Sequence, residues 1–363
     1  MDRMEYMTVK QELIGFLEQN KGTAVSGEAL AAGLGVSRAA VWKAVKILQK
    51  EGYPIEAVRN RGYTLHADSD RISAEGIRIY LPEQWKNVPV EVLSVVDSTN
   101  TYAKKQIAAG AFGASAGNPA DSAFHANTDV LAGANGNAAQ HAELAAPRHA
   151  IIAANEQTAG RGRLGRSFFS PADTGIYMSL VLAAGCRTED FLPITVAAAV
   201  AVSRVIERFT DDKPKIKWVN DVWLGNKKVC GILTEGISNF ENGTLEAAVV
   251  GIGINVDTEK NAFPEAVQNT AVSLGTVHAT RNELIAAVSA ELFDLAEDLK
   301  NPVLMQEYRD RSLILGKEIY WEKDGMRHEG RAADINDAGN LVVDTEEGPE
   351  TLISGEVSIR PLE

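Results

Sequence analysis

The start of the fold is decided by residues 26–50, which read SGEALAAGLGVSRAAVWKAVKILQK. Ser26 and Ser37 are residues of the kind that cap helix N-termini, and each precedes a helix-forming run. The second run, Arg38–Lys50, repeats valine and leucine at helical spacing, which predicts an amphipathic helix. A glycine-containing turn, Gly33–Val36, separates the two runs. Two short helices joined by such a turn form a helix-turn-helix.

A basic hairpin is expected after these helices. Ile55–Val58 and Tyr63–Leu65 are typical of two short strands, and residues 59–62 of the tip between them. The segment is therefore a predicted winged helix-turn-helix, whose third helix enters the major groove of DNA while the wing touches the backbone or the minor groove. The alternative is a helical interaction module whose basic side chains are merely solvated. The candidate DNA contacts are Ser37, Arg38, Lys43, Lys46, Arg59 and Arg61, with Trp42 near the groove.

The net charge of the chain is −13, which taken alone argues against binding nucleic acid. The charge is unevenly distributed, because residues 37–63 carry a net +4, residues 67–312 a net −8 and residues 313–363 a net −7. We interpret the change of sign as a change of domain and predict three domains, 1–66, 67–312 and 313–363. An acidic body would also limit non-specific binding to DNA.

Several classes of protein are disfavoured by the sequence. No run of about 18 uncharged apolar residues occurs, so we expect no transmembrane helix and no membrane partner. Residues 1–25 lack the apolar core of a signal peptide, which favours a cytoplasmic location. Cys186 and Cys230 are too few for a disulfide framework, and the six histidines show no metal-ligand spacing.

An alanine-rich segment interrupts the second predicted domain. Residues 108–150 contain 16 alanines and few branched apolar residues, so this stretch cannot build a packed core. We interpret residues 112–148 as a flexible surface insertion. His125, His141 and His149 are expected to be solvated loop histidines rather than metal ligands.

Small polar residues and glycines mark two candidate binding segments. Val95–Asn100 is interpreted as an apolar strand that ends in Asp-Ser-Thr-Asn, residues that can cap the following helix or face a ligand. Ile151–Ala154 predicts a strand that leads into a loop, where glycines at 160, 162 and 165 match G-x-G-x-x-G. The match is a weak dinucleotide fingerprint, because no helix is expected after it. The arginines at 161, 163 and 166 indicate phosphate binding instead, since guanidinium groups bind phosphate bidentately.

A third segment combines lysines with a carboxylate. Lys228 begins a predicted strand, Val229–Glu235, and lies close to Gly231, where it can neutralise a carboxylate or phosphate. Asp221 is a candidate Mg²⁺ ligand. A surface lysine pair and an Asn-Asp turn are the structural alternatives. Glycines at 251 and 253 in the strand Leu245–Val256 are expected to leave room for a ligand, and helices are expected at 192–209 and 281–299.

Short apolar runs separated by turn residues occupy residues 316–359 and predict a small β-barrel.

The chain closely resembles the bifunctional biotin–protein ligase and biotin operon repressor family in six features that occur in the same order along the sequence. They are the winged helix, Asp97–Asn100, Gln157–Arg163, Lys217–Asp221, Lys228–Leu233 and Gly251–Asn255. The resemblance covers nearly the whole chain apart from the alanine-rich insertion. It implies an α+β multidomain fold, with a winged helix-turn-helix, a central α/β ligase domain built on a mixed sheet, and an SH3-like barrel at the C-terminus.

The resemblance also implies roles for individual residues. Arg161 and Lys228 would be catalytic, and Phe168 would pack against adenine where the family usually has Trp. Val219 replaces the usual Pro. Contacts to biotin or biotinyl-5′-AMP would come from Ser98, Thr99, Asn100, Gln157, Gly160, Arg161, Gly162, Arg163, Lys228, Gly231 and Gly251.

The implied substrates are biotin and ATP with Mg²⁺, and the implied partners are a biotin carboxyl carrier domain, operator DNA and a second copy of the chain. Biotinyl-5′-AMP would be both the reaction intermediate and the corepressor. Two other interpretations stay open on the sequence. One is a regulator that senses a ligand without catalysis, and the other is a ligase for a related acyl group such as lipoate.

Overall fold

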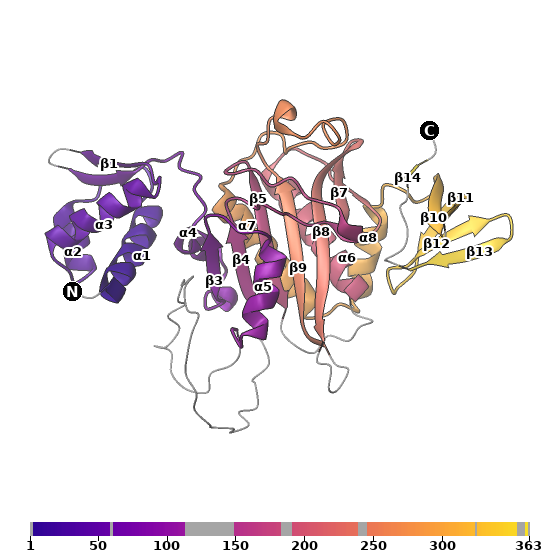
Figure 1. The fold of residues 1–363 in the computed structure, drawn as a ribbon, viewed down its shortest axis with the longest axis horizontal. Coiled ribbons are helices and arrows are strands. Elements are labelled where there is room, and N and C mark those ends of the chain that lie inside the picture. Colours follow the sequence, from indigo (N-terminus) through magenta and orange to yellow (C-terminus); the bar gives the residue numbers. More distant parts are fainter. Residues whose placement is uncertain are drawn as a thin grey trace, which may run out of the picture.

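The computed structural model describes residues 3–58, 61–112, 149–182, 191–238, 245–323, 325–353 and 360–361. They form three lobes along the long axis, with the N-terminal lobe at one end and the C-terminal lobe at the other (Figure 1). The boundaries at 66 and 312 remain predictions. Expectations for Arg59, His125, His141, Cys186, residues 113–148 and the strand at 357–359 fall outside the described residues.

The N-terminal lobe has the predicted winged helix-turn-helix. Its helices are α1 (Arg3–Gln19), α2 (Gly27–Gly33) and α3 (Arg38–Lys50), and its wing strands are β1 (Ile55–Val58) and β2 (Gly62–Leu65). Both predicted caps are confirmed, because Ser26 Oγ accepts from Ala29 N at 3.0 Å and Ser37 Oγ accepts from Ala40 N at 3.2 Å. A core of Leu13, Leu17, Leu30, Val45 and Leu48 joins the three helices.

A mixed seven-stranded sheet forms the central lobe. β3 and β4 are parallel, and every other neighbouring pair is antiparallel. In spatial order the strands are β3 (Val90–Leu93), β4 (Ala150–Ala154), β5 (Gly175–Leu182), β9 (Leu245–Asn255), β8 (Lys227–Ser238), β7 (Asp221–Leu224) and β6 (Lys215–Lys217).

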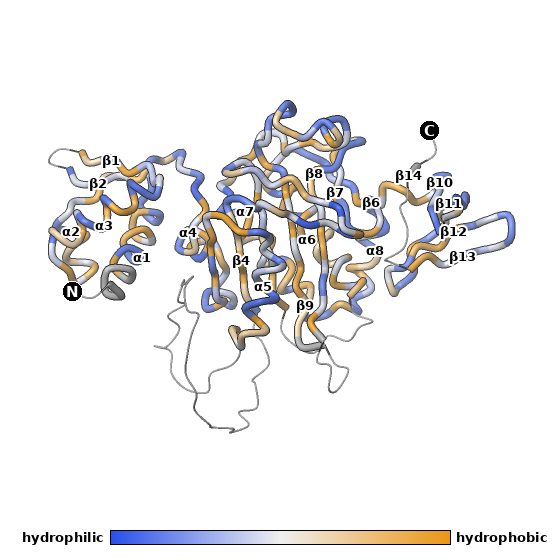
Figure 2. Tube along the Cα trace, in the orientation of Figure 1, coloured by the Kyte–Doolittle hydropathy of each residue, from blue (hydrophilic) through white to orange (hydrophobic). Residues whose placement is uncertain are grey.

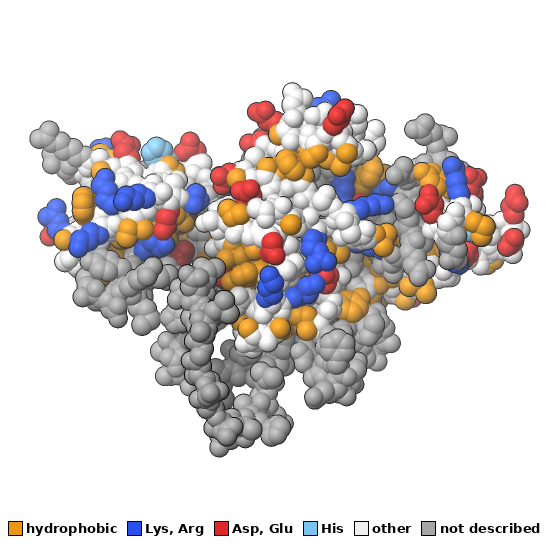
Figure 3. Space-filling view, in the orientation of Figure 1, with side chains coloured by type: hydrophobic (Ala, Val, Ile, Leu, Met, Phe, Trp, Pro, Cys, Tyr) orange, Lys and Arg blue, Asp and Glu red, His pale blue; other side chains and the backbone are white. Residues whose placement is uncertain are grey.

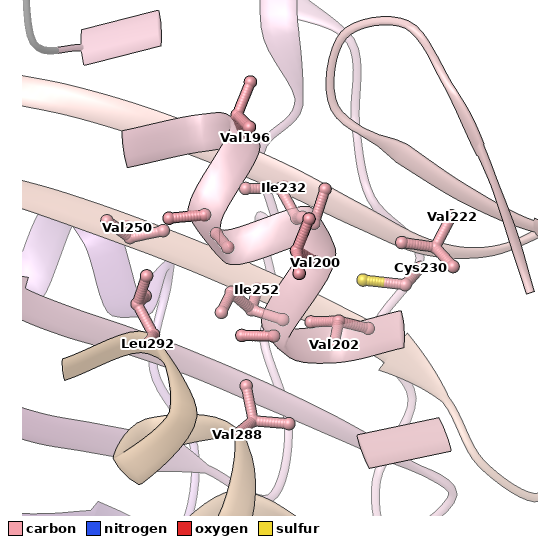
Figure 4. Packing of buried hydrophobic residues seen from close by; sticks show 14 of the residues in the cluster. Val196, Val200, Val202, Val222, Cys230, Ile232, Val250, Ile252, Val288 and Leu292 are labelled. Carbon is pink, nitrogen blue, oxygen red and sulfur yellow. The ribbon is translucent and has the colours of Figure 1, made fainter. Parts of the chain in front are cut away.

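Helices cover the two faces of this sheet unequally. One face packs against α4 (Ala74–Tyr80), α6 (Phe191–Phe209), α7 (Arg281–Ala296) and α8 (Pro302–Asp310). Figure 4 shows α6 valines between Ile232, Val250 and Ile252 of the sheet and Val288 and Leu292 of α7. Hydrophobic colour accordingly follows the sheet and α6 in Figure 2. Among the described helices, α5 (Thr99–Ala108) alone packs on the other face, over β4, β5 and β9.

The strand alternation explains why this second face is hollow. Successive side chains of a strand point to opposite faces, so large apolar residues of β8 and β9 enter the helical core. The alternate positions hold small residues, including Ser179 on β5, Gly231 on β8, and Gly251 and Gly253 on β9. Next to the first turn of α5, these small residues leave a cavity on the face of the sheet.

Hydrogen bonds connect the N-terminal lobe to the sheet through its linker. Arg281, at the start of α7, is almost completely buried. Its backbone N–H and Nε donate to the Asp70 carboxylate at 2.6 and 2.7 Å, and its Nη1 donates to Gly175 O on β5 at 3.3 Å. The next residue, Asn282, bonds the backbone of Ser73 and Arg71.

The C-terminal lobe is a five-stranded antiparallel sheet in the order β13-β12-β11-β10-β14. Its strands are β10 (Glu318–Lys323), β11 (Met326–Ile335), β12 (Leu341–Thr345), β13 (Gly348–Leu352) and β14 (Arg360–Pro361). Among the described strands β13 and β14 are edges without a mutual pairing, so a closed barrel is not confirmed. Trp218 Nε1 donates to Gly339 O at 2.9 Å and thereby joins this lobe to the central lobe.

Three local expectations were wrong. The apolar strand before residue 97 ends at Leu93, and Val95 is exposed. The helix from Arg281 ends at Ala296 rather than residue 299. His149 is half-buried rather than freely solvated, because its ring stacks on Phe293 with centroids 4.8 Å apart and meets the edge of Trp85. Burial in this aromatic cluster lowers the pKa of His149.

Candidate functional site

A cavity of about 610 Å³ opens on the hollow face of the central sheet. Its wall is built by the first turn of α5, the Gly–Arg loop (residues 160–168), and strands β7, β8 and β9. The lining brings together nearly all the predicted ligand residues, namely Ser98, Thr99, Asn100, Gln157, Arg161, Gly162, Arg163, Phe168, Asp221, Lys228, Gly231 and Gly251. These residues come from six segments that the sequence separates by up to about 150 positions.

One end of the cavity is polar and uncharged. Thr99 N donates to Gln157 Oε1 at 2.9 Å, and Gln157 Nε2 donates to Ser170 Oγ at 2.9 Å. Ser98 occupies the N-cap position of α5, but its side chain makes no capping bond. The capping alternative for the Ser98 side chain is therefore wrong.

The glycines of β8 and β9 make room for protein side chains as well as for a ligand. A Cβ on Gly251 would lie 2.3 Å from Asn100 Oδ1, and one on Gly253 would lie 2.4 Å from the Phe168 ring. Gly160 is equally confined, since its Cβ would lie 2.4 Å from Phe168 O. Gly251 and Gly253 both line the cavity, where they were expected to leave room for a ligand, and they also make room for Asn100 and Phe168.

The Gly–Arg loop returns on itself as a tight hairpin. Gly162 N donates to Arg166 O at 2.7 Å, and Phe168 N donates to Gly160 O at 2.8 Å. Leu164 and Gly165 have φ angles of 55° and 74° at the tip. No α-helix follows the glycines, so the weak dinucleotide interpretation fails, as expected.

The loop arginines face different parts of the cavity. Arg161 Nη1 donates weakly to Thr101 Oγ1 at 3.4 Å on α5. Arg163 Nη1 donates to Asn220 Oδ1 at 3.1 Å, and burial lowers the pKa of its guanidinium group. Arg163 also lines a second cavity of about 490 Å³, which extends from α6 to Asn340 in the C-terminal lobe.

Lysines and one carboxylate occupy the β7–β8 side. Lys228 Nζ lies 2.7 Å from Asp221 Oδ1, so the two predicted residues form an ion pair. Lys217 Nζ lies 4.8 Å from the centroid of the Trp223 ring. The described lining holds five basic side chains, from Arg161, Arg163, Arg166, Lys217 and Lys228, but only one carboxylate, that of Asp221. This end therefore suits an anionic ligand.

The described residues contain no group of three or more histidine, cysteine or acidic side chains arranged to hold a metal. Cys230 is a buried packing residue, and burial raises the pKa of its thiol. Among the described helices none is long and apolar enough to cross a membrane.

A second candidate surface is the exposed side of α3. Ser37, Arg38, Lys43 and Lys46 are exposed there, as is Arg61 in the turn just before β2. Trp42 lies one helical turn from Arg38 and Lys46, and 53% of its surface is exposed. Lys and Arg side chains gather on this lobe in Figure 3, whereas acidic side chains stand at the outer tip of the C-terminal lobe. The predicted basic face is thus present, apart from the undescribed Arg59.

Sequence reasoning missed some residues of the site. Ser179 is a fully buried hydroxyl in the otherwise apolar stretch around β5, which was the available signal. Glu235 bonds Asn100 from β8 although it only ended a predicted strand. Trp223 and Asn220 line the cavity, and the indole N–H of Trp223 has no hydrogen-bond partner within the described part of the chain.

These features define a class of protein. A winged helix with a basic face is joined to a sheet whose cavity has a neutral polar end and a cationic end, as expected of a DNA-binding protein that also handles an anionic small molecule.

Comparisons with known proteins narrow this class. Models of an HTH domain, of the biotin/lipoate A/B protein ligase family and of the biotin protein ligase C-terminal domain match residues 9–64, 137–255 and 314–360. The bifunctional ligase/repressor BirA of Bacillus subtilis (strain 168) is 30% identical over 369 residues, covering 97% of this chain and 99% of that protein. The Escherichia coli (strain K12) protein of the same name is 27% identical over 99% of this chain and 100% of its own.

A solved structure agrees with these matches. The biotin protein ligase from Aquifex aeolicus in complex with biotin and ATP aligns with a TM-score of 0.53 and 25% identity, over 76% of this chain and 99% of that one. The chain belongs to the family of bifunctional biotin ligases and repressors.

Proposed function

We propose that this protein joins biotin to ATP to form biotinyl-5′-AMP and pyrophosphate, and then transfers biotin to a lysine of a carboxyl carrier domain. The observation that carries the proposal is the division of one cavity into a neutral polar end and a cationic end. Biotin has a neutral ureido ring and a carboxylate tail. The ring suits Ser98, Thr99 and Gln157, and the tail suits the basic side chains.

The cationic end supplies what the first step needs. Attack of the biotin carboxylate on the α-phosphate brings two anions together, so catalysis depends on positive charge held in advance. Lys228 and Arg161 are proposed to supply it, and Arg163 and the backbone of Gly160 and Gly162 to enclose the phosphate. The new bond joins a carboxylate oxygen to phosphorus, while the bond from phosphorus to pyrophosphate breaks.

Mg²⁺ would enter with ATP. Asp221 is the one carboxylate in the described lining, and a single carboxylate completed by substrate phosphates is a donor set that Mg²⁺ accepts. Bound there, the ion would neutralise phosphate charge. Phe168, which lies over Gly253, is proposed to pack beside the adenine.

The second step needs no nucleophile from the enzyme. The carrier lysine attacks the carbonyl of the mixed anhydride, forms an amide and releases AMP. For the C-terminal lobe we propose an SH3-like domain that helps to hold ATP or the carrier, since the second cavity extends to Asn340. A cytoplasmic location stays a prediction.

For regulation, we propose that biotinyl-5′-AMP favours a dimer that presents two winged helices to a palindromic operator. The exposed basic face of α3 supports this proposal, because a recognition helix with basic and aromatic side chains suits the major groove. Sedimentation with and without biotin plus ATP tests the coupling, and an unchanged molecular mass would count against it.

A pyrophosphate assay tests the enzymatic proposal. Release should require both biotin and MgATP, and labelled biotin should then appear on a purified carrier domain. The matched control replaces biotin with lipoate. Pyrophosphate release with lipoate but not with biotin would identify the alternative acyl ligase. If neither acid supports release, the alternative of a non-catalytic sensor would remain.

A further inference from the structure

A charged pair lies directly behind the neutral end of the cavity and outside its lining. Lys104 Nζ on α5 donates to Glu235 Oε1 on β8 at 2.6 Å, and the two side chains are 31% and 19% exposed. The other carboxylate oxygen, Oε2, accepts from Asn100 Nδ2 at 2.8 Å. Burial alone would raise the pKa of Glu235, but the bonds from Lys104 and Asn100 outweigh burial and lower it. The carboxylate is therefore ionised at neutral pH.

The negative charge determines which way the Asn100 amide faces. Asn100 Nδ2 lies between two acceptors, Glu235 Oε2 and Leu233 O, the latter at 3.1 Å. An amide oxygen in that place would meet two acceptors with no proton between them. The amide oxygen must therefore face the other way, toward Ser179 Oγ, which donates to it across 2.6 Å.

From Asn100 the hydrogen bonds continue to the ligand loop. Ser179 is completely buried, and its Oγ also lies 2.7 Å from Thr99 Oγ1. Since the one hydroxyl proton of Ser179 goes to Asn100, this 2.7 Å contact takes the hydroxyl proton of Thr99, and Gln157 Oε1 accepts from Thr99 N at 2.9 Å. Gln157 Nε2 then reaches Ser170 beyond the Gly–Arg loop. One chain of side chains thus runs from an ion pair at the edge of α5 to two residues of the cavity wall. Because each member has few protons to share, fixing one amide orders its neighbours.

We propose that Glu235, held by Lys104, is a positioning residue of the biotin site, which sets the orientation of Asn100 and Ser179 and so of the groups that Thr99 and Gln157 present to the ring. The inference rests on the proposed function, because it concerns how the same cavity recognises the ureido ring. It assigns Lys104 and Glu235 no contact with biotin and no part in the chemistry.

The variant Glu235→Gln tests the proposal. The glutamine keeps the shape but brings no charge and can place its own amide hydrogens against Asn100, which then loses its fixed orientation. We expect KM for biotin to rise about tenfold, as the loss of one charge-assisted hydrogen bond would give. The turnover number at saturating biotin and KM for ATP should stay within about twofold, because the ordered groups act on the ring alone.

The neighbouring lysine supplies a matched pair. Lys104→Met leaves Glu235 without its cation and should raise KM for biotin by about threefold, which is half of the Glu235→Gln effect on a logarithmic scale. Lys105→Met removes a lysine from the next position, where the ammonium group pairs with Asp97 at 3.6 Å on the surface. This control should leave KM for biotin unchanged. If Glu235→Gln does not fold, Lys104→Met carries the test against the same control.

A charge exchange separates positioning from simple stabilisation. The double variant Lys104→Glu with Glu235→Lys restores the ion pair but puts an ammonium group, which only donates, against Asn100 Nδ2. We expect the thermal midpoint to recover while KM for biotin stays high. Recovery of both, or an unchanged KM in Glu235→Gln, would overturn the proposal. Wild-type protein that releases no pyrophosphate with biotin would instead refute the proposed function, so the two failures are distinguishable.

Discussion

Two groups of charged side chains in the central lobe differ in their balance. Behind the sheet, Arg204 bonds Glu291 and Glu307 at 3.3 and 2.6 Å, and Arg311 bonds Glu207 and Glu307 at 2.9 and 2.8 Å. Arg208 completes the group by pairing with Glu291. On the opposite face, the described cavity lining holds five basic side chains and one carboxylate.

The group with balanced charges holds helices together, whereas the group with surplus positive charge is suited to binding an anion. Three arginines facing three glutamates satisfy one another and tie α6, α7 and α8 together, so this group needs no further partner. The cavity lining, by contrast, carries more basic than acidic side chains, and a folded protein keeps such a surplus only at a cost in stability. The same surplus occurs on α3, where Arg38 and Lys46 pair with no carboxylate among the described residues.

The largest expected effect comes from removing a charge of the cavity. Lys228→Ala should slow biotin-dependent pyrophosphate release by about 100-fold or more, because one preorganised positive group is lost where two anions meet. Its binding to duplex DNA should be unchanged. Lys227→Ala, one residue earlier on β8 and outside the described lining, is the control. Equal losses in both variants would show that the positive charge at Lys228 has no special role.

Next in size is the effect on DNA binding. In the double variant Arg38→Ala with Lys46→Ala, the dependence of log affinity on log salt should become shallower by about two, roughly one for each lost phosphate contact. The measurement is a salt titration on a duplex of mixed sequence, which requires no knowledge of the operator. An unaltered slope would show that Arg38 and Lys46 on the exposed face of α3 do not contact DNA phosphates.

The balanced group should affect stability rather than activity. Glu307→Gln weakens the bonds from Arg204 and Arg311 and should lower the free energy of unfolding at pH 7 by about 1–2 kcal/mol. Burial alone would raise the pKa of Glu307, but those two arginines outweigh it and lower the pKa below 4.5. Its contribution is therefore present above pH 4.5 and is lost as the pH falls through the lower folded value.

Denaturant unfolding at several pH values measures this effect. The wild type and Glu307→Gln should converge in stability as the pH falls below 4.5, while their pyrophosphate release at pH 7 stays equal. A constant difference at all pH values would mean that the charge of Glu307 is not the source.

The smallest expected effect separates the two helix caps of the winged helix. Ser26→Ala and Ser37→Ala each remove a cap and should each lower stability by about 1 kcal/mol. Only Ser37 lies on the exposed face of α3, so only Ser37→Ala should also weaken DNA binding. Chemical denaturation and a DNA titration on the same two proteins measure both, and equal DNA affinities would limit Ser37 to its capping role.

Much of the fold was predictable because its signals are local. The range Arg38–Lys50 was predicted to the residue, since a serine cap and helical periodicity both lie within it. The two wing strands were equally clear, because turn residues at 59–62 separate two short strand-forming runs. By contrast Val95 resembles a strand residue but is exposed, since no neighbouring strand is there to pair with it.

The site was predictable in its members but not in their arrangement. The local motifs indicated Thr99 as a ligand-facing alternative and Lys228 as a partner for a carboxylate or phosphate, and the family resemblance added Gln157; all three line the cavity. The motifs did not indicate that Lys228 pairs with Asp221. Nor did they indicate that Gly251 makes room for Asn100, since that contact joins segments far apart along the chain.

The helices and their caps, the wing, the uneven charge and the ligand-binding motifs follow from local sequence, because each depends on residues within a few positions of one another. The ion pairs behind the sheet and the surplus of basic side chains in the cavity arise only in the folded chain. The tertiary structure also placed Glu235 and Lys104 behind Asn100. A charge acquires its partner only when strands and helices from distant parts of the chain are brought within hydrogen-bond distance.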